Sequence, residues 1–245
     1  MSRTKRRGGF TGTDRHKRQK STPKQSLDRQ ISNRPEQTEF ERSVATLNPE
    51  DLAARFTKAI QKHKGDLSTI ELEDQSVPAK AFRNTTAFAE PRVVQNLAQF
   101  LEQNTAGGAD ELKTCQEKAS PHTLLVTLSA IRTTDLVRAV RGYGSEDNKI
   151  AKLFAKNKLN EMVDYVQKTQ FGIGAGTGKR IEDLIARDVL KIDKLRRVVV
   201  DASYTDEKKN TIFEDRVAFS QLLSLLNLEL LKLRLFSGDT ELLVF

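Results

Sequence analysis

The pattern of apolar and polar positions divides the chain near residue 48. Residues 1–47 contain few apolar side chains and many Arg, Lys, Gln, Ser and Thr residues. Such a composition cannot form a hydrophobic core, so it predicts a disordered basic tail. Beyond the tail, apolar residues recur at the spacings of helices and strands. We expect a helical extension and strap over residues 48–120 and an α/β lobe over 121–245, with 48–245 forming one structural unit.

The first ordered element is expected to be a helix over residues 48–65. Asn48 can cap this helix, and Pro49 suits its first position. Its apolar face would be formed by Leu52, Phe56 and Ile60. Three further segments are expected before residue 121: an irregular strap over 67–88, a second helix over 91–103 and a flexible loop over 105–120.

The second half of the chain alternates between apolar runs and amphipathic segments. The runs 122-HTLLVTLS-129 and 196-RRVVVDAS-203 are apolar and β-branched, as are strands buried on both faces of a parallel sheet. Residues 171–176 and 241–245 predict two shorter strands. Helices are expected over 132–142, 159–169, 178–190 and 212–235. This alternation favours an α/β fold with a doubly wound parallel sheet.

Ligands of such sheets bind beyond the carboxyl ends of the strands. The segments that follow the predicted strands are Ser129–Arg132, Gly176–Arg180 and Asp201–Asp206. We therefore expect these three segments to lie along one edge and to face a common surface.

The net charge of +8 is concentrated in the tail. Residues 1–34 contain eleven Lys or Arg and two Asp, a local charge of +9, whereas the remainder has a charge of −1. Two basic clusters about ten residues apart have the layout of a bipartite nuclear import signal, which favours nuclear import or nucleic-acid contact over a merely solvated tail. The clusters consist of Lys5, Arg6, Arg7, Lys17, Arg18 and Lys20.

Several classes of protein are excluded by composition. Cys115 is the only cysteine, which excludes an intramolecular disulfide framework and fits a reducing compartment. His16, His63 and His122 do not stand at metal-ligand spacing, so no metal site is expected. No apolar run is long enough to span a bilayer, and no signal peptide is recognisable. We expect a soluble intracellular protein without membrane contact.

The loop 171-FGIGAGTGKR-180 departs from a nucleotide-binding loop. The motif G-x-x-x-x-G-K-[ST] needs a hydroxyl for Mg²⁺, but Arg180 stands at that position and Ile173 replaces the first glycine. Asp201 ends a predicted strand, yet Ala202 follows it where a second acid would be expected. No catalytic residue, cofactor or small-molecule substrate is therefore expected.

The same loop retains the features of an anion site. Its glycines permit close backbone approach, Thr177 offers a hydroxyl, and a helix amino terminus attracts negative charge. A nucleic-acid backbone would satisfy such a site without Mg²⁺. The alternative is a glycine-rich turn needed only for tight packing between strand and helix. The candidate RNA- or phosphate-binding residues at this edge are Arg132, Gly176, Thr177, Gly178, Lys179 and Arg180.

Two stretches resemble motifs of DEAD-box RNA helicases. Residues 176-GTGKRI-181 are similar to the RNA-gripping motif G-T-P-G-R-I, with Gly178 and Lys179 in the places of Pro and Gly. Residues 196-RRVVVDASYTD-206 resemble the strand that carries D-E-A-D, of which only Asp201 is retained. No A-x-x-G-x-G-K-T motif is found in the chain.

This combination resembles a narrower group, the Cms-type family of nucleolar proteins of the small-subunit (90S) pre-ribosome. The stretches that carry the resemblance are 69-TIELEDQSVPAKAF-82, Pro121–Arg132, the G-x-G-T-x-x-R-I loop and the V-x-D-x-S…D-x-K run that ends at Lys208. The resemblance implies a single degenerate helicase-like lobe with a RecA-like (P-loop NTPase-like) fold and no ATPase motifs.

The resemblance also implies a function. It points to a non-catalytic ribosome biogenesis factor in the nucleolus, which binds pre-ribosomal RNA or 90S assembly proteins during rRNA processing. Two alternatives stay open. One is an ATP-dependent helicase-like enzyme that a partner completes, and the other is a protein-only scaffold in which the tail alone contacts RNA.

Overall fold

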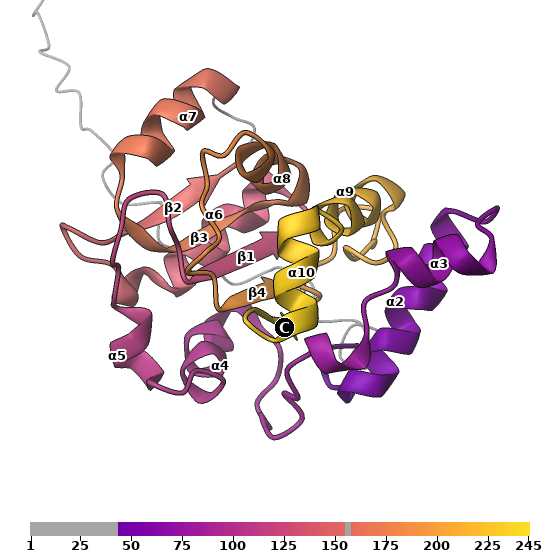
Figure 1. Ribbon diagram of the computed structural model, residues 1–245. Helices are drawn as coiled ribbons and strands as arrows, with labels where there is room; N and C mark the ends of the chain where they lie inside the picture. The colour runs from indigo at the N-terminus through magenta and orange to yellow at the C-terminus, as the bar shows by residue number, and fades with distance from the viewer. Residues whose placement is uncertain (1–43, 155–157) are drawn as a thin grey trace, which may run out of the picture. The chain divides into compact units, whose positions relative to one another are not determined.

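The computed structural model describes residues 44–154 and 158–245, all of which belong to one compact unit, Gln37–Phe245 (Figure 1). The basic clusters of the predicted tail lie outside the described residues. Val44 and Ala45 are already buried, so packing begins ahead of the expected boundary at residue 48. None of the described helices is both long and apolar enough to cross a membrane.

The centre of the described unit is a five-stranded sheet with the order β2-β3-β1-β4-β5. All four pairings of neighbouring strands are parallel. In the central register, Leu125 pairs with Ala175 on one side and with Val199 on the other. The strands are β1 (Thr123–Thr127), β2 (Lys149–Leu153), β3 (Phe171–Thr177), β4 (Arg197–Val200) and β5 (Glu241–Val244). The expected α/β fold with a parallel sheet is confirmed.

Helices cover both faces of this sheet (Figure 1). One face packs against α2 (Pro49–His63), α7 (Leu159–Lys168), α8 (Gly178–Ala186), α9 (Arg216–Leu226) and α10 (Glu229–Ser237). The short helix α3 (Thr69–Gln75) packs beside α2 at the periphery (Figure 1). The other face packs against α4 (Leu97–Gln103), α5 (Gly108–Leu112) and α6 (Ala130–Ala139). Because side chains alternate along a strand, Leu124 and Val126 enter the first core while Leu125 enters the second.

Short 3₁₀ helices connect these elements. They are η1 (Ala79–Ala81), η2 (Val94–Asn96) and η3 (Arg141–Tyr143). Next to η1, Phe82 pairs with Leu242 and the amide of Arg83 donates to the carbonyl of Leu242 at 2.9 Å. The strap thereby covers part of the outer edge of β5, which would otherwise offer unpaired backbone groups.

The expected first helix, α2, is confirmed together with its cap. The side chain of Asn48 accepts a hydrogen bond from the amide of Asp51 at 2.9 Å, and Pro49 occupies the first turn. The apolar face of the helix is buried, with the ring of Phe56 meeting those of Phe82 and Phe213 at centroid distances of 5.1 and 5.0 Å. Capping and periodicity, both local signals, therefore determine this element.

Two segments expected to be irregular contain short helices. Within the strap, α3 begins with a capping box: Glu71 accepts from the amide of Ser68 at 2.8 Å, and the hydroxyl of Ser68 accepts from the amide of Glu71 at 3.3 Å. The S-x-x-E pattern signals this start, so the expectation of irregular structure is wrong for residues 69–75. In the expected flexible loop, α5 forms over Gly108–Leu112 because Leu112 packs into the core.

The sequence pattern missed β2. Its residues, 149-KIAKL-153, contain two exposed lysines, since β2 is an edge strand. The helix expected over 212–235 is instead two helices, α9 and α10, which are separated by the cap residues Asn227 and Leu228. The side-chain amide of Asn227 donates to the carbonyls of Leu223 and Gln75 at 3.0 and 3.3 Å, a tertiary contact that local periodicity does not reveal.

Candidate nucleic-acid interface

The carboxyl ends of β1, β3 and β4 meet along one edge of the sheet. Thr127 at the end of β1 pairs with Thr177 at the end of β3, and Val126 pairs with Val200 of β4. The three segments that the sequence placed at a common edge are thus neighbours in space. Side-chain packing decides which of their residues face solvent.

Asp201 lies at the centre of this edge as a buried carboxylate. Arg132 donates to both of its oxygens, from Nε to Oδ2 at 2.7 Å and from Nη2 to Oδ1 at 3.3 Å. The hydroxyl of Thr127 donates to Oδ2 at 3.2 Å. Ser203 donates to Oδ1 from its hydroxyl at 2.7 Å and from its amide at 3.2 Å. Five hydrogen bonds therefore satisfy this carboxylate within the protein.

Arg132 is correspondingly turned inward. Its Nη2 lies 2.7 Å from the hydroxyl oxygen of Ser203, and its guanidinium carbon lies 5.3 Å from the centre of the Tyr204 ring. The sequence placed Arg132 among the phosphate-facing residues, and the structure corrects this expectation because the side chain is buried and paired with Asp201. Sequence reasoning could not find the pair, since its two members are separated by 69 positions.

Gly176 near the end of β3 and Gly178 at the start of α8 allow close packing. A Cβ atom at Gly176 would lie 2.0 Å from the carbonyl oxygen of Leu153 in β2, which is far inside van der Waals contact. A Cβ atom at Gly178 would lie 3.0–3.1 Å from the backbone of Gln221 in α9. Arg180 is also buried. These three candidates thus lie in packed positions, which favours the packing interpretation for Gly176 and Gly178.

Thr177 and Lys179 are the candidates that remain at least partly exposed. Thr177 is the N-cap residue of α8, and its side chain makes no capping hydrogen bond. The ammonium of Lys179 lies 3.0 Å from Asp183 Oδ1 and 3.4 Å from Glu182 Oε2. The hydrogen bond to Asp183 is the main reason why the pKa of Lys179 is raised. Lys179 is therefore a cation whose field the neighbouring acids partly cancel.

The described residues contain no group of three or more His, Cys, Asp or Glu side chains arranged to hold a metal ion. Asp201 is the carboxylate at the strand end where enzymes of this fold class place a Mg²⁺ ligand. Its oxygens are instead bonded to Arg132, Thr127 and Ser203. Both oxygens of this buried carboxylate therefore already have hydrogen-bond donors within the protein.

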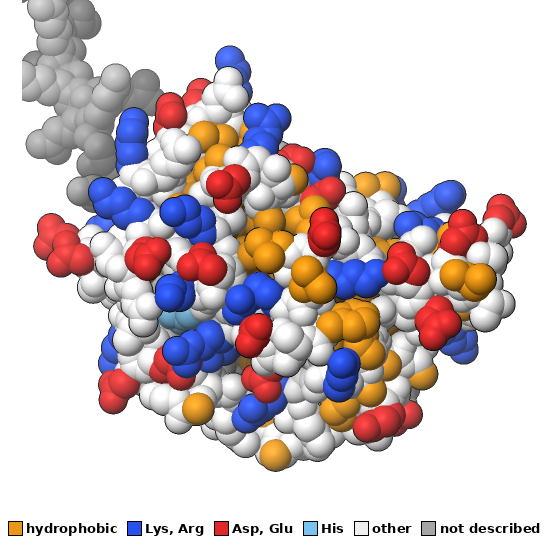
Figure 2. Space-filling model, in the orientation of Figure 1, with side chains coloured by type: hydrophobic (Ala, Val, Ile, Leu, Met, Phe, Trp, Pro, Cys, Tyr) orange, Lys and Arg blue, Asp and Glu red, His pale blue; other side chains and the backbone are white. Residues whose placement is uncertain are grey.

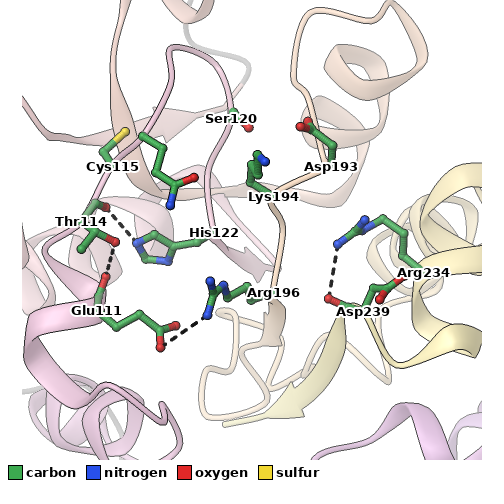
Figure 3. A pocket seen from close by; sticks show the side chains of 11 residues that line it. Glu111, Thr114, Cys115, Ser120, His122, Asp193, Lys194, Arg196, Arg234 and Asp239 are labelled. Atoms are coloured by element: carbon green, nitrogen blue, oxygen red, sulfur yellow. Dashed lines mark hydrogen bonds and ion pairs between the residues drawn. The ribbon is translucent and has the colours of Figure 1, made fainter.

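At the opposite end of the strands, where β1, β4 and β5 begin, the protein contains a cavity of about 340 Å³ (Figure 3). Acidic, basic and neutral polar side chains line it, from the helices α5 and α10 and from the loops that precede β1, β4 and β5. The lining residues are Glu111, Thr114, Cys115, Gln116, Ser120, His122, Asp193, Lys194, Arg196, Arg234 and Asp239. Sequence reasoning did not single out this cavity, because its residues come from distant parts of the chain.

Among the residues that line the cavity, His122 has a strongly lowered pKa. Its Nε2 lies 3.2 Å from the carbonyl oxygen of Thr114 and must donate, since a carbonyl only accepts. Nδ1 then accepts from the hydroxyl of Thr123 at 2.7 Å, and that hydroxyl accepts from Arg197 at 3.2 Å. Arg197 in turn pairs closely with Glu111. Burial, followed by the nearby Arg197 charge, lowers the pKa of His122 to about 4, so the ring is neutral at physiological pH.

The full chain, residues 1–245, matches a family model described as "CMS1: U3-containing 90S pre-ribosomal complex subunit". Protein CMS1 of Chaetomium thermophilum is 38% identical over 187 residues, which cover 76% of this chain and 74% of that relative. Protein cms1 of Schizosaccharomyces pombe is 27% identical, covering 69% of this chain and 60% of the relative. Protein CMSS1 of Homo sapiens is 27% identical, covering 67% of this chain and 57% of the relative. This chain thus spans less than two thirds of the length of the latter two.

Among solved structures, a Saccharomyces cerevisiae dbp5 variant bound to nup159 and gle1 is similar with a TM-score of 0.44 and 15% identity. The similarity covers 79% of this chain and 46% of that chain. A DEAD box protein from Methanococcus jannaschii has a TM-score of 0.43 and 14% identity, covering 74% and 48%. At these identities the likeness concerns the fold alone.

Proposed function

Because the chain belongs to the CMS1 family of U3-containing 90S pre-ribosomal complex subunits, we propose that it is a non-catalytic, RNA-binding component of that complex. The family description supports a role in ribosome biogenesis. A 90S subunit acts where pre-ribosomal RNA is processed, so the proposed location is the nucleolus. The proposed partners are pre-ribosomal RNA and assembly proteins of the complex.

The non-catalytic proposal rests on the hydrogen bonding of the Asp201 carboxylate. A nucleotide hydrolase needs a carboxylate at this strand end whose oxygens are available to Mg²⁺. Here Arg132 provides two charge-assisted hydrogen bonds to Asp201, and removing it would leave a buried, unpaired charge. An ATPase completed by a partner would first have to break this pair, which argues against that alternative.

RNA binding is supported by the distribution of charge. The local charge of +9 in residues 1–34, which lie outside the described residues, is of the size that neutralises several phosphates. At the strand-end edge, Thr177 and Lys179 are the accessible candidates, although Asp183 pairs with Lys179. We assign most of the RNA affinity to the tail and a minor, positioning contribution to this edge.

A protein-only scaffold is the second candidate function. It is favoured by the pairing of Lys179 with Glu182 and Asp183, which reduces the attraction of the lobe for phosphate. In that version the lobe contacts only proteins, and the tail alone reaches RNA.

The test combines nucleotide and RNA measurements on the full chain. Calorimetry with ATP and Mg²⁺, with and without RNA, is expected to show no binding, and measurable binding would overturn the non-catalytic proposal. Crosslinking followed by RNA sequencing is expected to recover pre-ribosomal RNA. Recovery of bulk messenger RNA alone would contradict the RNA-binding proposal.

A further inference from the structure

Helix α10 is apolar on the side that faces solvent as well as on the side that faces the core. Leu231 and Leu235 are buried in the core. Leu230, Leu233 and Phe236 are 56%, 61% and 39% exposed. These three exposed residues, here called the α10 strip, recur every three positions and so share one face of the helix. Figure 2 shows hydrophobic side chains gathered on the surface over α10.

The strip is not needed to hold α10 in place. Arg234 donates to the carbonyl of Leu195 at 2.9 Å and to the hydroxyl of Thr240 at 3.1 Å. Lys232 pairs with Asp74 of α3 at 2.8 Å. A surface helix with such anchors ordinarily carries polar residues on its outer face. A contiguous exposed apolar surface on a soluble lobe typically marks an interaction site.

The two ends of the strip have opposite charges. Glu229 is exposed at the amino end of α10, one turn before Leu233. At the carboxyl end, the ammonium of the exposed Lys80 lies 5.6 Å from the centre of the Phe236 ring. Neither Glu229 nor Lys80 forms an ion pair within residues 44–154 and 158–245. The strip is therefore an apolar track with an acid at one end and a base at the other.

We propose that the α10 strip docks an amphipathic helix of another protein in the assembly. The nine residues of α10 span about 13 Å, which matches roughly two turns of a partner helix. The partner helix presents apolar side chains to Leu230, Leu233 and Phe236. It places a basic residue near Glu229 and an acidic residue near Lys80, because both charges lack an ionic partner in the described part of the chain. An RNA backbone fits this surface poorly, since the apolar face offers no donors and Glu229 repels phosphate.

A second copy of this chain could satisfy the same charges if two α10 helices packed antiparallel, but the area is too small. With the roughly 150–250 Å² that an aromatic side chain buries taken as an upper range for each of the three residues, their exposed parts amount to at most on the order of 300 Å² per copy. A stable pair of proteins buries about 800 Å² per partner. A contact of this size is adequate as one of several within a large assembly, where the other contacts raise the effective concentration. This proposal goes beyond RNA binding and does not depend on it.

The test uses crosslinking mass spectrometry on purified 90S particles that contain the full-length chain. Crosslinks from Lys80 and Lys232 should reach one protein segment that is helical and apolar on one face, with basic and acidic residues about two turns apart. A synthetic peptide of that segment should bind the full chain, and the double variant Leu230→Glu/Leu233→Glu should weaken this binding at least tenfold. The matched control is Ile131→Glu, because Ile131 is 64% exposed on α6, at the opposite face of the sheet.

Three outcomes would overturn the proposal. They are crosslinks to a second copy of the chain, ultraviolet crosslinks from the strip to RNA, and equal peptide affinity for the double variant and the Ile131→Glu control. Circular dichroism should show equal melting temperatures for both variants and the original chain, because the substituted positions are exposed. RNA recovery should not change in the double variant, so failure of the RNA-binding proposal and failure of the docking proposal give different results.

Discussion

At the scale of single residues, Arg132 and Asp201 show how the same side chains serve different purposes in different surroundings. In the sequence, an arginine after one strand and an aspartate after another indicate a ligand-binding edge. In the structure they pair with each other and are buried. A buried pair of this kind contributes little net stability by itself. Removing one partner is nevertheless strongly destabilising, because it leaves an unpaired charge in the core.

Replacement of Arg132 should therefore destabilise the lobe without affecting RNA directly. Arg132→Met leaves the Asp201 carboxylate buried and unpaired, and we expect a loss of about 3–5 kcal/mol in the free energy of unfolding. The free energy of unfolding of Arg132→Met/Asp201→Leu should fall by less than that of the single variant, because the double variant leaves no unpaired buried charge. Urea denaturation measures both, and a loss below about 1 kcal/mol in Arg132→Met would contradict the burial argument. RNA affinity of the folded variant should stay unchanged.

Arg92 is a second residue whose surroundings could not be anticipated. It is fully buried against the rings of Phe88 and Phe100, with its guanidinium carbon 4.6 and 4.8 Å from their centroids. It donates to the carbonyls of Thr85 at 2.9 Å and of Ala45 at 3.3 Å. Burial lowers the pKa of Arg92 to about 10, so it remains charged. Aromatic faces and carbonyl oxygens replace a carboxylate as its partners.

At the scale of elements, the polar network at the start of β1 connects two strands to α5 and to the loop that follows it. Thr123 begins β1 and Arg197 begins β4, and their side chains join His122 to Glu111. The network requires a neutral His122 whose Nδ1 can accept from Thr123. Protonation of His122 would give both ring nitrogens a proton and would remove this acceptor.

Stability should therefore fall as the pH falls through the range below neutrality. His122 in the unfolded chain takes up a proton near pH 6.5, whereas in the folded chain it does so only near pH 4. The unfolded state thus binds more protons between these values, and the free energy of unfolding decreases with decreasing pH. We expect a loss of about 2 kcal/mol between pH 7 and pH 5 from this group. Urea denaturation at several pH values measures it.

The matched control for this pH dependence is His122→Gln, which keeps a polar side chain but cannot titrate. The difference in unfolding free energy between the two proteins should shrink as the pH is lowered from 7 to 5. Parallel profiles would show that His122 does not carry the pH dependence. His16 and His63 are present in both proteins, so the difference between the two profiles isolates His122.

At the scale of the whole molecule, the charge is divided between two parts of the chain. The tail carries the net positive charge, whereas residues 35–245 have a charge of −1. The salt dependence of RNA binding reports the number of phosphates that the protein neutralises. It can therefore distinguish a tail-driven interaction from one centred on the strand-end edge.

Neutralising the tail should flatten the salt dependence far more than neutralising the loop. The tail variant replaces Lys5, Arg6, Arg7, Lys17, Arg18 and Lys20 by Gln. If each of these contacts one phosphate of single-stranded RNA, the slope of log K against log[salt] should fall by roughly four units. Lys179→Gln should change it by less than about one unit, because Asp183 already pairs with Lys179. Fluorescence anisotropy at several salt concentrations measures both slopes. A larger effect of Lys179→Gln would place the main RNA contact at the edge.

The sequence by itself determined the parallel α/β class, the capped helix α2, the strands β1 and β4 and the meeting of three segments at one edge. These follow from local periodicity, capping and connection rules, which act over a few residues. Only the tertiary structure decided that Arg132 pairs with Asp201 and that the carbonyl of Leu153 approaches Gly176 too closely for a side chain there. It also decided that α10 leaves an apolar face exposed. Each of these depends on groups far apart in the chain, and burial decides whether a charged or apolar side chain meets a partner within the protein or remains available to another molecule.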